Sequence, residues 1–107
     1  MEVPFVPVLF TRSGATIIML SGLEYCLNLE QLEAFNNDIM GLSSLTGLIK
    51  LKTLLLSNTN VRDIKALVGN KGLSSGDIVD LRGYPLSLKS IFAHIPKLKA
   101  RGVNVYR

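Results

Sequence analysis

A chain of 107 residues that is 48% hydrophobic has the size of one domain and enough apolar material for a core, which excludes the disordered and fibrous classes. The single cysteine, Cys26, excludes an intrachain disulfide and cannot by itself form a zinc site. No apolar run approaches the roughly 18 residues that a membrane helix needs, and residues 1–10 lack the basic start and cleavage site of a signal peptide, so the compartment stays open.

The net charge of +4 is distributed unevenly along the chain. Residues 1–49 carry Arg12 against five acidic residues, which gives −4, and residues 50–107 carry eleven Lys and Arg against three Asp, which gives +8. In a fold whose sequence order is also its spatial order, this distribution predicts an acidic end and a basic end. An ordinary solvated surface is the alternative interpretation.

Residues 1–12 are an apolar strand candidate that Pro4 and Pro7 interrupt. Proline cannot donate to a strand ladder, so we expect an edge strand or a terminal cap. The segment that begins at Val3 and ends at Phe10 has more apolar surface than one inner face can bury. We therefore expect it either to fold over the adjacent part of the chain or to pair with a second copy as a homodimer.

Residues 29–61 contain two copies of one pattern in fixed register. The spacing LxxLxLxxNxL starts at Leu29 and again at Leu51, and the agreement continues past it, because Leu42 matches Ile64 and Leu45 matches Leu67. The pattern consists of Leu29, Leu32, Ala34, Asn37 and Ile39, and then of Leu51, Leu54, Leu56, Thr59 and Val61. This period predicts a solenoid whose unit is one short strand plus a return segment. The chain therefore resembles the leucine-rich repeat family, in the 22-residue class of internalin-like bacterial proteins.

The same register extends backwards only in part. The preceding return segment keeps it, but the strand positions would fall on Phe10 and Arg12, and an inward arginine is unsuitable for a core. We infer that the register breaks before Ser13. Cys26 aligns with Leu48, so we predict a small buried side chain, with a reactive thiol as the alternative.

A polar residue after each strand is expected to satisfy backbone groups of the turn. Asn37 has this role in the first repeat through its amide, and Thr59 takes part of it in the second repeat through its hydroxyl. In the third repeat Tyr84 stands at this place, and we expect Pro85 to hold the turn instead.

The spacing from the second strand to the third, Leu54 to Val79, is longer than the spacing from Leu32 to Leu54. Residues 69–76 supply the extra length and are rich in Gly, Asn and Ser, which predicts a loop that bulges from one face. The motif GxxxxGK[ST] is absent, so a plain connection is favoured over nucleotide binding.

Residues 87–107 are predicted to form a C-terminal cap. Ser87 fits a helix N-cap, apolar residues follow at helical spacing, and Pro96 restarts a second short turn. With GDxVDLRGxPLS before it and HIPxLxARGVxV at its end, this tail is similar to the final repeats of bacterial leucine-rich repeat proteins. His94 has no second His or Cys nearby, so we interpret it as a surface or cap residue and not as a ligand or base.

The predicted fold class is α/β. We expect a short right-handed leucine-rich repeat solenoid with a curved parallel sheet on the concave side, 3₁₀ turns and loops on the convex side, and a short cap helix. The strands are expected near residues 30–35, 52–57, 78–82 and 103–106. The single domain 1–107 is divided into a degenerate N-terminal repeat or cap, two full repeats, and a third repeat with its cap, over residues 1–28, 29–50, 51–75 and 76–107.

Alternation along the strands predicts which side chains point inward and which lie on the concave face. The inward set is Leu32, Ala34, Leu54, Leu56, Val79, Leu81, Val103 and Val105. The concave, partner-binding set is Gln31, Glu33, Phe35, Thr53, Leu55, Ser57, Ile78, Asp80 and Arg82. Within it, the apolar members on successive strands are predicted to form one stripe rimmed by charged residues, as an interaction site requires. Cover by the N-terminal segment or by a second copy is the alternative.

No motif for a reaction is present, and the titratable groups are scattered. We therefore expect a non-catalytic protein–protein interaction module that binds an unidentified protein partner and uses no cofactor or metal. We expect no nucleic-acid binding, because the basic half lacks interleaved aromatics and a recognised motif, and we expect no membrane span. A self-assembling homodimeric unit and the C-terminal end of a longer solenoid are the alternatives.

Overall fold

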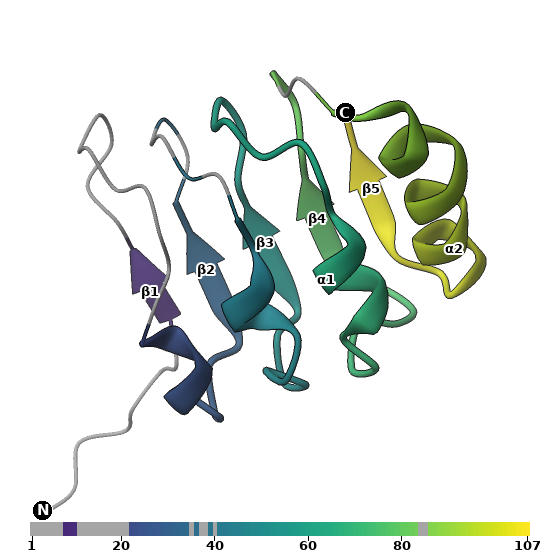
Figure 1. The fold of residues 1–107 in the computed structure, drawn as a ribbon. Helices are drawn as coiled ribbons and strands as arrows, with labels where there is room; N and C mark the ends of the chain where they lie inside the picture. The colour runs from purple at the N-terminus through teal and green to yellow at the C-terminus, as the bar shows by residue number, and fades with distance from the viewer. Residues whose placement is uncertain (1–7, 11–21, 35, 37–38, 40, 84–85) are drawn as a thin grey trace, which may run out of the picture.

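The fold is that of a computed structural model, which describes residues 8–10, 22–34, 36, 39, 41–83 and 86–107. Five short parallel strands form one sheet in sequence order, β1-β2-β3-β4-β5. They are β1 (Val8–Phe10), β2 (Gln31–Glu33), β3 (Thr53–Leu55), β4 (Ile78–Asp80) and β5 (Asn104–Tyr106). Figure 1 shows the five strands side by side in this order. This sequential parallel sheet confirms the predicted solenoid.

Short helical elements lie in the return segments. They are the 3₁₀ turns η1 (Leu23–Tyr25) and η2 (Ser43–Leu45), the helix α1 (Lys65–Gly69), the π turn η3 (Ser90–His94) and the helix α2 (Ile95–Ala100). Residues 88–89 are helical as well, so the last elements form one continuous run, residues 88–100, which we call the cap helix. The predicted 3₁₀ turns and cap helix are therefore present, and α1 is an additional helical element.

The strand register is set by the central residue of each strand. Leu32 pairs with Leu54, Leu54 with Val79, and Val79 with Val105. The first three of these side chains are fully buried, whereas the flanking residues are mostly half-buried. A slip by one residue would turn every buried side chain to the opposite face, so burial fixes the register.

The edge strand β1 departs from the repeat register. Leu9 is aligned with Leu32, so the repeat projection that placed Phe10 there is wrong by one residue. This shift of one residue agrees with the inferred break in the repeat register. The edge-strand prediction is confirmed for Val8–Phe10. The remainder of residues 1–12, and Ser13, lie outside the described residues.

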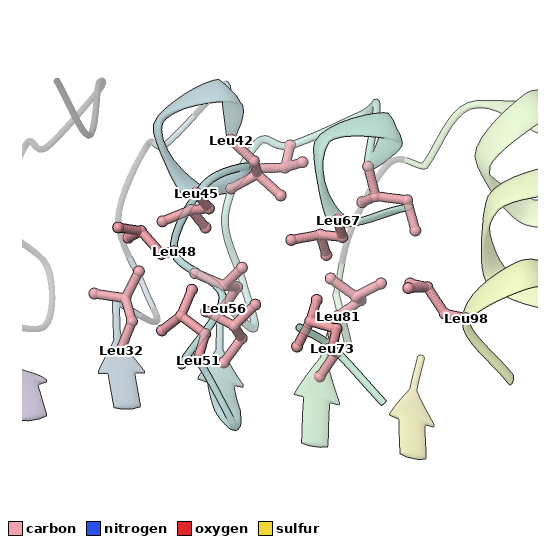
Figure 2. Packing of buried hydrophobic residues seen from close by; sticks show 14 of the residues in the cluster. Leu32, Leu42, Leu45, Leu48, Leu51, Leu56, Leu67, Leu73, Leu81 and Leu98 are labelled. Carbon is pink, nitrogen blue, oxygen red and sulfur yellow. The ribbon is translucent and has the colours of Figure 1, made fainter. Parts of the chain in front are cut away.

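Leucine columns along the solenoid make up the core (Figure 2). Leu45 and Leu67 occupy one repeat position, and Leu51 and Leu73 occupy another. The largest fully buried side chains are Leu32, Ile39, Leu45, Leu48, Leu51, Leu54, Leu56, Ile64, Leu67, Leu73, Leu81 and Leu98. The predicted inward set is buried, except that Val105 is half-buried on the last strand.

Cys26 is exposed, so its predicted burial is wrong. Its counterpart Leu48 is fully buried one repeat further along the chain. Cys26 lies in the first described return segment, so no earlier described return segment packs over it. Repeat position therefore predicts burial only within the stack and not at its end.

A buried asparagine interrupts one leucine column. Asn70 is fully buried at the repeat position of Leu48. Its Nδ2 donates to the carbonyl oxygens of Leu45, at 2.8 Å, and Leu48, at 3.0 Å, and its Oδ1 accepts from the Gly72 N–H at 2.9 Å. All three polar positions of the amide are thus used to join two successive return segments.

The segment 69–76 therefore differs from the bulging surface loop that its composition predicts, because part of it is buried. Helix α1 ends at Gly69, and Asn70 and Leu73 then enter the core. The backbone at Gly72 lies close to the previous repeat, because a Cβ on Gly72 would overlap the Ile49 carbonyl oxygen. Glycine is needed at this position for close backbone approach.

Side-chain hydrogen bonds fasten the cap helix to the second full repeat. Ser87 caps its N-terminus as predicted, because its Oγ accepts from the Ser90 N–H at 3.2 Å. The Ser90 hydroxyl, fully buried, accepts from the Ile64 N–H at 3.1 Å. At the other end Arg101 donates to the carbonyl oxygens of Val68, at 2.6 Å, and Asn70, at 3.1 Å.

Replacing Leu54 by Ala should lower the free energy of unfolding by about 2–5 kcal/mol, because the side chain is fully buried and leaves a cavity. Urea denaturation followed by circular dichroism measures the change. Thr53→Ala, next in the chain but half-buried on the other face, is the control and should change stability by less than about 1 kcal/mol. Equal losses in both variants would contradict the face assignment.

Replacing Asn70 by Leu restores the leucine of the repeat column yet should destabilise the chain by about 1–3 kcal/mol. The leucine leaves the Gly72 N–H and the carbonyl oxygens of Leu45 and Leu48 without the amide. Thermal unfolding of the parent and the variant measures the difference. An unchanged or higher midpoint would mean that these groups find other partners.

Candidate functional site

The concave face is the sheet face opposite the buried leucine columns, and strand register arranges its side chains in rows. The first row contains Gln31, Thr53, Ile78 and Asn104, and the second contains Glu33, Leu55, Asp80 and Tyr106. Ser57 and Arg82 follow beyond the carboxyl ends of β3 and β4. The register thus brings the described members of the predicted site onto one face. Phe35 lies outside the described residues.

The predicted apolar stripe is staggered. Leu55 is aligned across the strands with Glu33 and Asp80, whereas Ile78 is aligned with Thr53. Leu55 and Ile78 are therefore diagonal neighbours, and both side chains are half-buried. A polar residue flanks each of them within its row, so the described part of the surface is a mixed patch and not a continuous apolar stripe.

Asp80 departs from its predicted position on the rim. Its side chain is only 9% exposed, because the Arg82 side chain folds back onto it. Arg82 donates from Nε to both carboxylate oxygens, at 3.0 and 3.2 Å, and from Nη2 to Oδ2 at 2.6 Å. The Arg82 N–H adds a fourth bond at 3.1 Å. The expectation of an exposed Asp80 is therefore wrong.

This pair holds an arginine side chain in one orientation on the concave face. The hydrogen bonds from Arg82 keep the pKa of the Asp80 carboxyl below its usual value, against the opposing effect of burial. The same hydrogen bonds raise the pKa of the Arg82 guanidinium. The Arg82 side chain is still 66% exposed. A fixed, exposed guanidinium loses little entropy when it binds, which suits it to an interface.

Two concave residues of β5 extend the surface beyond the predicted site. Asn104 and Tyr106 are exposed and continue the two rows. The sequence signal for them is their alternation with the inward Val103 and Val105, which places Asn104 and Tyr106 on the opposite face of the strand. Tyr106 is a residue type that interfaces favour, because its ring is apolar and its hydroxyl is polar.

The turns after the strands contain a column of residues in the left-handed conformation. Asn36 and Asn58 have φ angles of 58° and 56°, and Gly83 has a φ of 80°. The Asn58 Nδ2 donates to the Asn36 Oδ1 at 3.0 Å, and a Cβ on Gly83 would clash with Asn58. Asn and Gly at these positions are the sequence signal, because they tolerate the left-handed region.

Thr59 does not have the predicted turn role. Its side chain is buried, and its Oγ1 has no hydrogen-bond partner among the described residues. The left-handed residue one position earlier, Asn58, makes the inter-turn bond instead. Asn37, Tyr84 and Pro85 lie outside the described residues.

A cluster of the buried Ser90 and His94 with the exposed Asp63 links the cap helix to the residues before α1. His94 Nδ1 lies 3.0 Å from Ser90 Oγ and 3.6 Å from Asp63 Oδ1, and the imidazole is buried. Asp63 Oδ1 also accepts from the Lys65 N–H at 2.8 Å. In a catalytic triad the serine and the carboxylate contact opposite ring nitrogens. Here both contact the same nitrogen and the serine is buried, so the geometry is that of a cap contact.

His94 is therefore a cap residue, as predicted, but a buried one. Within the part of the chain that the structure describes, no three His, Cys, Asp or Glu residues gather closely enough to hold a metal ion. Among the same residues, no helix has the length and apolar character needed to cross a membrane.

Acidification should remove the stabilising effect of the Asp80–Arg82 pair. Because the folded-state pKa of Asp80 is lowered, its stabilising effect is present above the unfolded-state pKa and is lost as pH falls through the folded-state value. The free energy of unfolding should therefore fall more between about pH 6 and about pH 2 in the parent than in Asp80→Asn. Urea titrations at the two pH values measure this difference. Parallel losses would show that the pair contributes no pH-dependent stability.

Comparison with known proteins agrees with this geometry. Neither a protein-family model nor a curated protein matches the chain by sequence. Among solved structures, internalin C2 of Listeria monocytogenes is similar at 26% identity and a TM-score of 0.68, and the internalin InlF of the same species at 29% and 0.70. Each match covers 86% of this chain but only 37% and 26% of the two internalin chains. By repeat motif, strand register and structural similarity, the chain has a leucine-rich repeat solenoid that is similar to the solenoids of these internalins.

Proposed function

We propose that the chain is a non-catalytic module that binds a protein partner through the concave face. The observation that carries the proposal is the Arg82 guanidinium, which is held on Asp80. Asp80 is itself aligned across the strands with the half-buried Leu55 and the exposed Tyr106. Arginine and tyrosine dominate binding energy at protein interfaces, particularly beside apolar contacts that exclude water. Similarity to internalin solenoids supports a protein-interaction repeat at the level of the family.

The proposed surface comprises the predicted concave residues together with the two that β5 adds. They are Gln31, Glu33, Phe35, Thr53, Leu55, Ser57, Ile78, Asp80, Arg82, Asn104 and Tyr106. Asp80 serves by orienting Arg82 and not by direct contact, since its carboxylate is covered. Gln31 Nε2 donates to Glu33 Oε2 at 2.6 Å, so the acidic part of the surface is held in place as well. Phe35 enters the surface by sequence alternation alone.

A bulky substitution on each face of the solenoid tests the proposal. Ser57→Arg adds a long charged side chain to the concave face, and Ser43→Arg makes the same change on η2, with the same gain of charge. Both should change stability by less than about 1 kcal/mol. Ser57→Arg should abolish photo-crosslinked capture of a protein from a lysate of the source cells, and Ser43→Arg should retain it. Equal capture by both variants would exclude the concave face.

Association of two copies through residues 3–10 is the second candidate, because Val8–Phe10 forms the edge strand of the sheet. Light scattering decides between the two. A monomeric mass favours the module that binds a partner through its concave face. A dimeric mass that disappears on deletion of residues 1–7 favours self-association.

A further inference from the structure

The outer face of the cap helix carries a row of apolar side chains. Leu88 and Phe92 are 73% and 76% exposed, and Pro96 and Ala100 are exposed at the same spacing of four residues. We call these four residues the cap ridge. A terminal repeat of a solenoid ordinarily presents a polar outer face. Two large, almost fully exposed apolar side chains on consecutive turns therefore indicate a surface that contacts something other than water.

The π turn keeps the cap ridge in line. In an α-helix, residues four apart are rotated by about 40° about the axis, so a row of four would wind around the helix. The π turn η3 contains more residues per turn than an α-helix, so the rotation between residues four apart is smaller there. The buried side of the helix has the same spacing through Ser90, His94 and Leu98, which fixes the cap ridge on the side facing away from the core.

The surroundings of the cap ridge are basic. Residues 81–107 contain six Lys and Arg and no Asp or Glu. Lys89, Lys97 and Lys99 lie on the cap helix itself and are exposed. Within the described residues, no ion pair involves these three lysines, whereas Arg82 is paired with Asp80. Apolar side chains and uncompensated cations therefore share one exposed helix at the C-terminal end of the stack (Figure 1).

We propose that the cap helix docks on an anionic phospholipid surface. Leu88 and Phe92 enter the boundary between headgroups and acyl chains, and the lysines stay at the level of the phosphates. Charge complementarity identifies this occupant, because all charged side chains of the cap are positive. A lipid surface can also receive protruding side chains without a preformed complementary groove. A nucleic acid offers the same charge but gives Leu88 no apolar environment.

The first test uses vesicles and a fluorescent reporter. The chain contains no tryptophan, so Phe92→Trp introduces a single reporter on the cap ridge. With phosphatidylcholine vesicles that contain phosphatidylglycerol, its emission should shift to the blue as the ring leaves water. Pure phosphatidylcholine should cause a much smaller shift. Ile49→Trp, at an exposed apolar residue of another repeat, is the control and should not shift.

Co-sedimentation of the full chain with the same vesicles separates the contribution of the apolar side chains from that of the lysines. Leu88→Ser with Phe92→Ser should lower affinity about tenfold or more, and Leu27→Ser with Ile49→Ser, also exposed, should not. Lys97→Glu with Lys99→Glu should lower affinity about 20-fold or more, since each lysine near the surface contributes about fivefold. The control with the same charge change is Lys65→Glu with Lys71→Glu.

Three results would overturn the proposal. The first is the absence of any blue shift for Phe92→Trp with anionic vesicles at low salt. The second is vesicle binding that survives the serine substitutions at Leu88 and Phe92. The third is equally tight, Leu88- and Phe92-independent binding to duplex DNA or an acidic polypeptide, which would assign the lysines to a polyanion. The concave variants test a different surface, so either proposal can fail alone.

Discussion

The alignment of one buried residue per strand is the constraint on which the rest of the structure depends. Leu32, Leu54 and Val79 lie beside one another at the centres of three neighbouring strands, and none is exposed. Because side chains alternate along a strand, this alignment also determines which residues reach the concave face and which of them become neighbours. Asp80, which holds Arg82, lies beside Tyr106 and not beside Asn104 for this reason. The candidate site is thus a consequence of core packing.

Buried polar groups determine how the repeats end. A leucine at position 70 would fill the same space but could not pair the carbonyl oxygens of the previous return segment. Ser90 performs the corresponding task at the cap by pairing the Ile64 N–H. Asn70 lies where the return segment is longer than in the previous repeat, and Ser90 lies where the cap helix replaces a return segment. Unpaired backbone groups are costly in an interior, so each departure from the repeat needs a polar side chain at its own position.

The sequence was most informative where periodicity and burial coincide. The repeat period predicted the strands and the inward leucines, because each apolar position must repeat for its neighbours to be covered. Helical spacing after Ser87 predicted the cap helix. The repeat period misplaced Cys26, since a period is silent about where the stack ends. It also misplaced the turn role assigned to Thr59, because a left-handed backbone conformation, and not the hydropathy pattern, selects Asn58 for the bond between turns. The Asp80–Arg82 pair escaped prediction because alternation gives the face of a side chain but not its rotamer.

The contact between Ser90 and Ile64 has a consequence for the order of events during synthesis. The Ile64 N–H receives its partner from a residue 26 positions later in the chain. A nascent chain that has emerged only as far as α1 therefore holds this amide without its native acceptor. Neighbour-to-neighbour stacking would otherwise let each repeat dock as it leaves the ribosome. The second full repeat thus reaches its final hydrogen bonding only after the cap has been made, so a later part of the chain completes the interior of an earlier one.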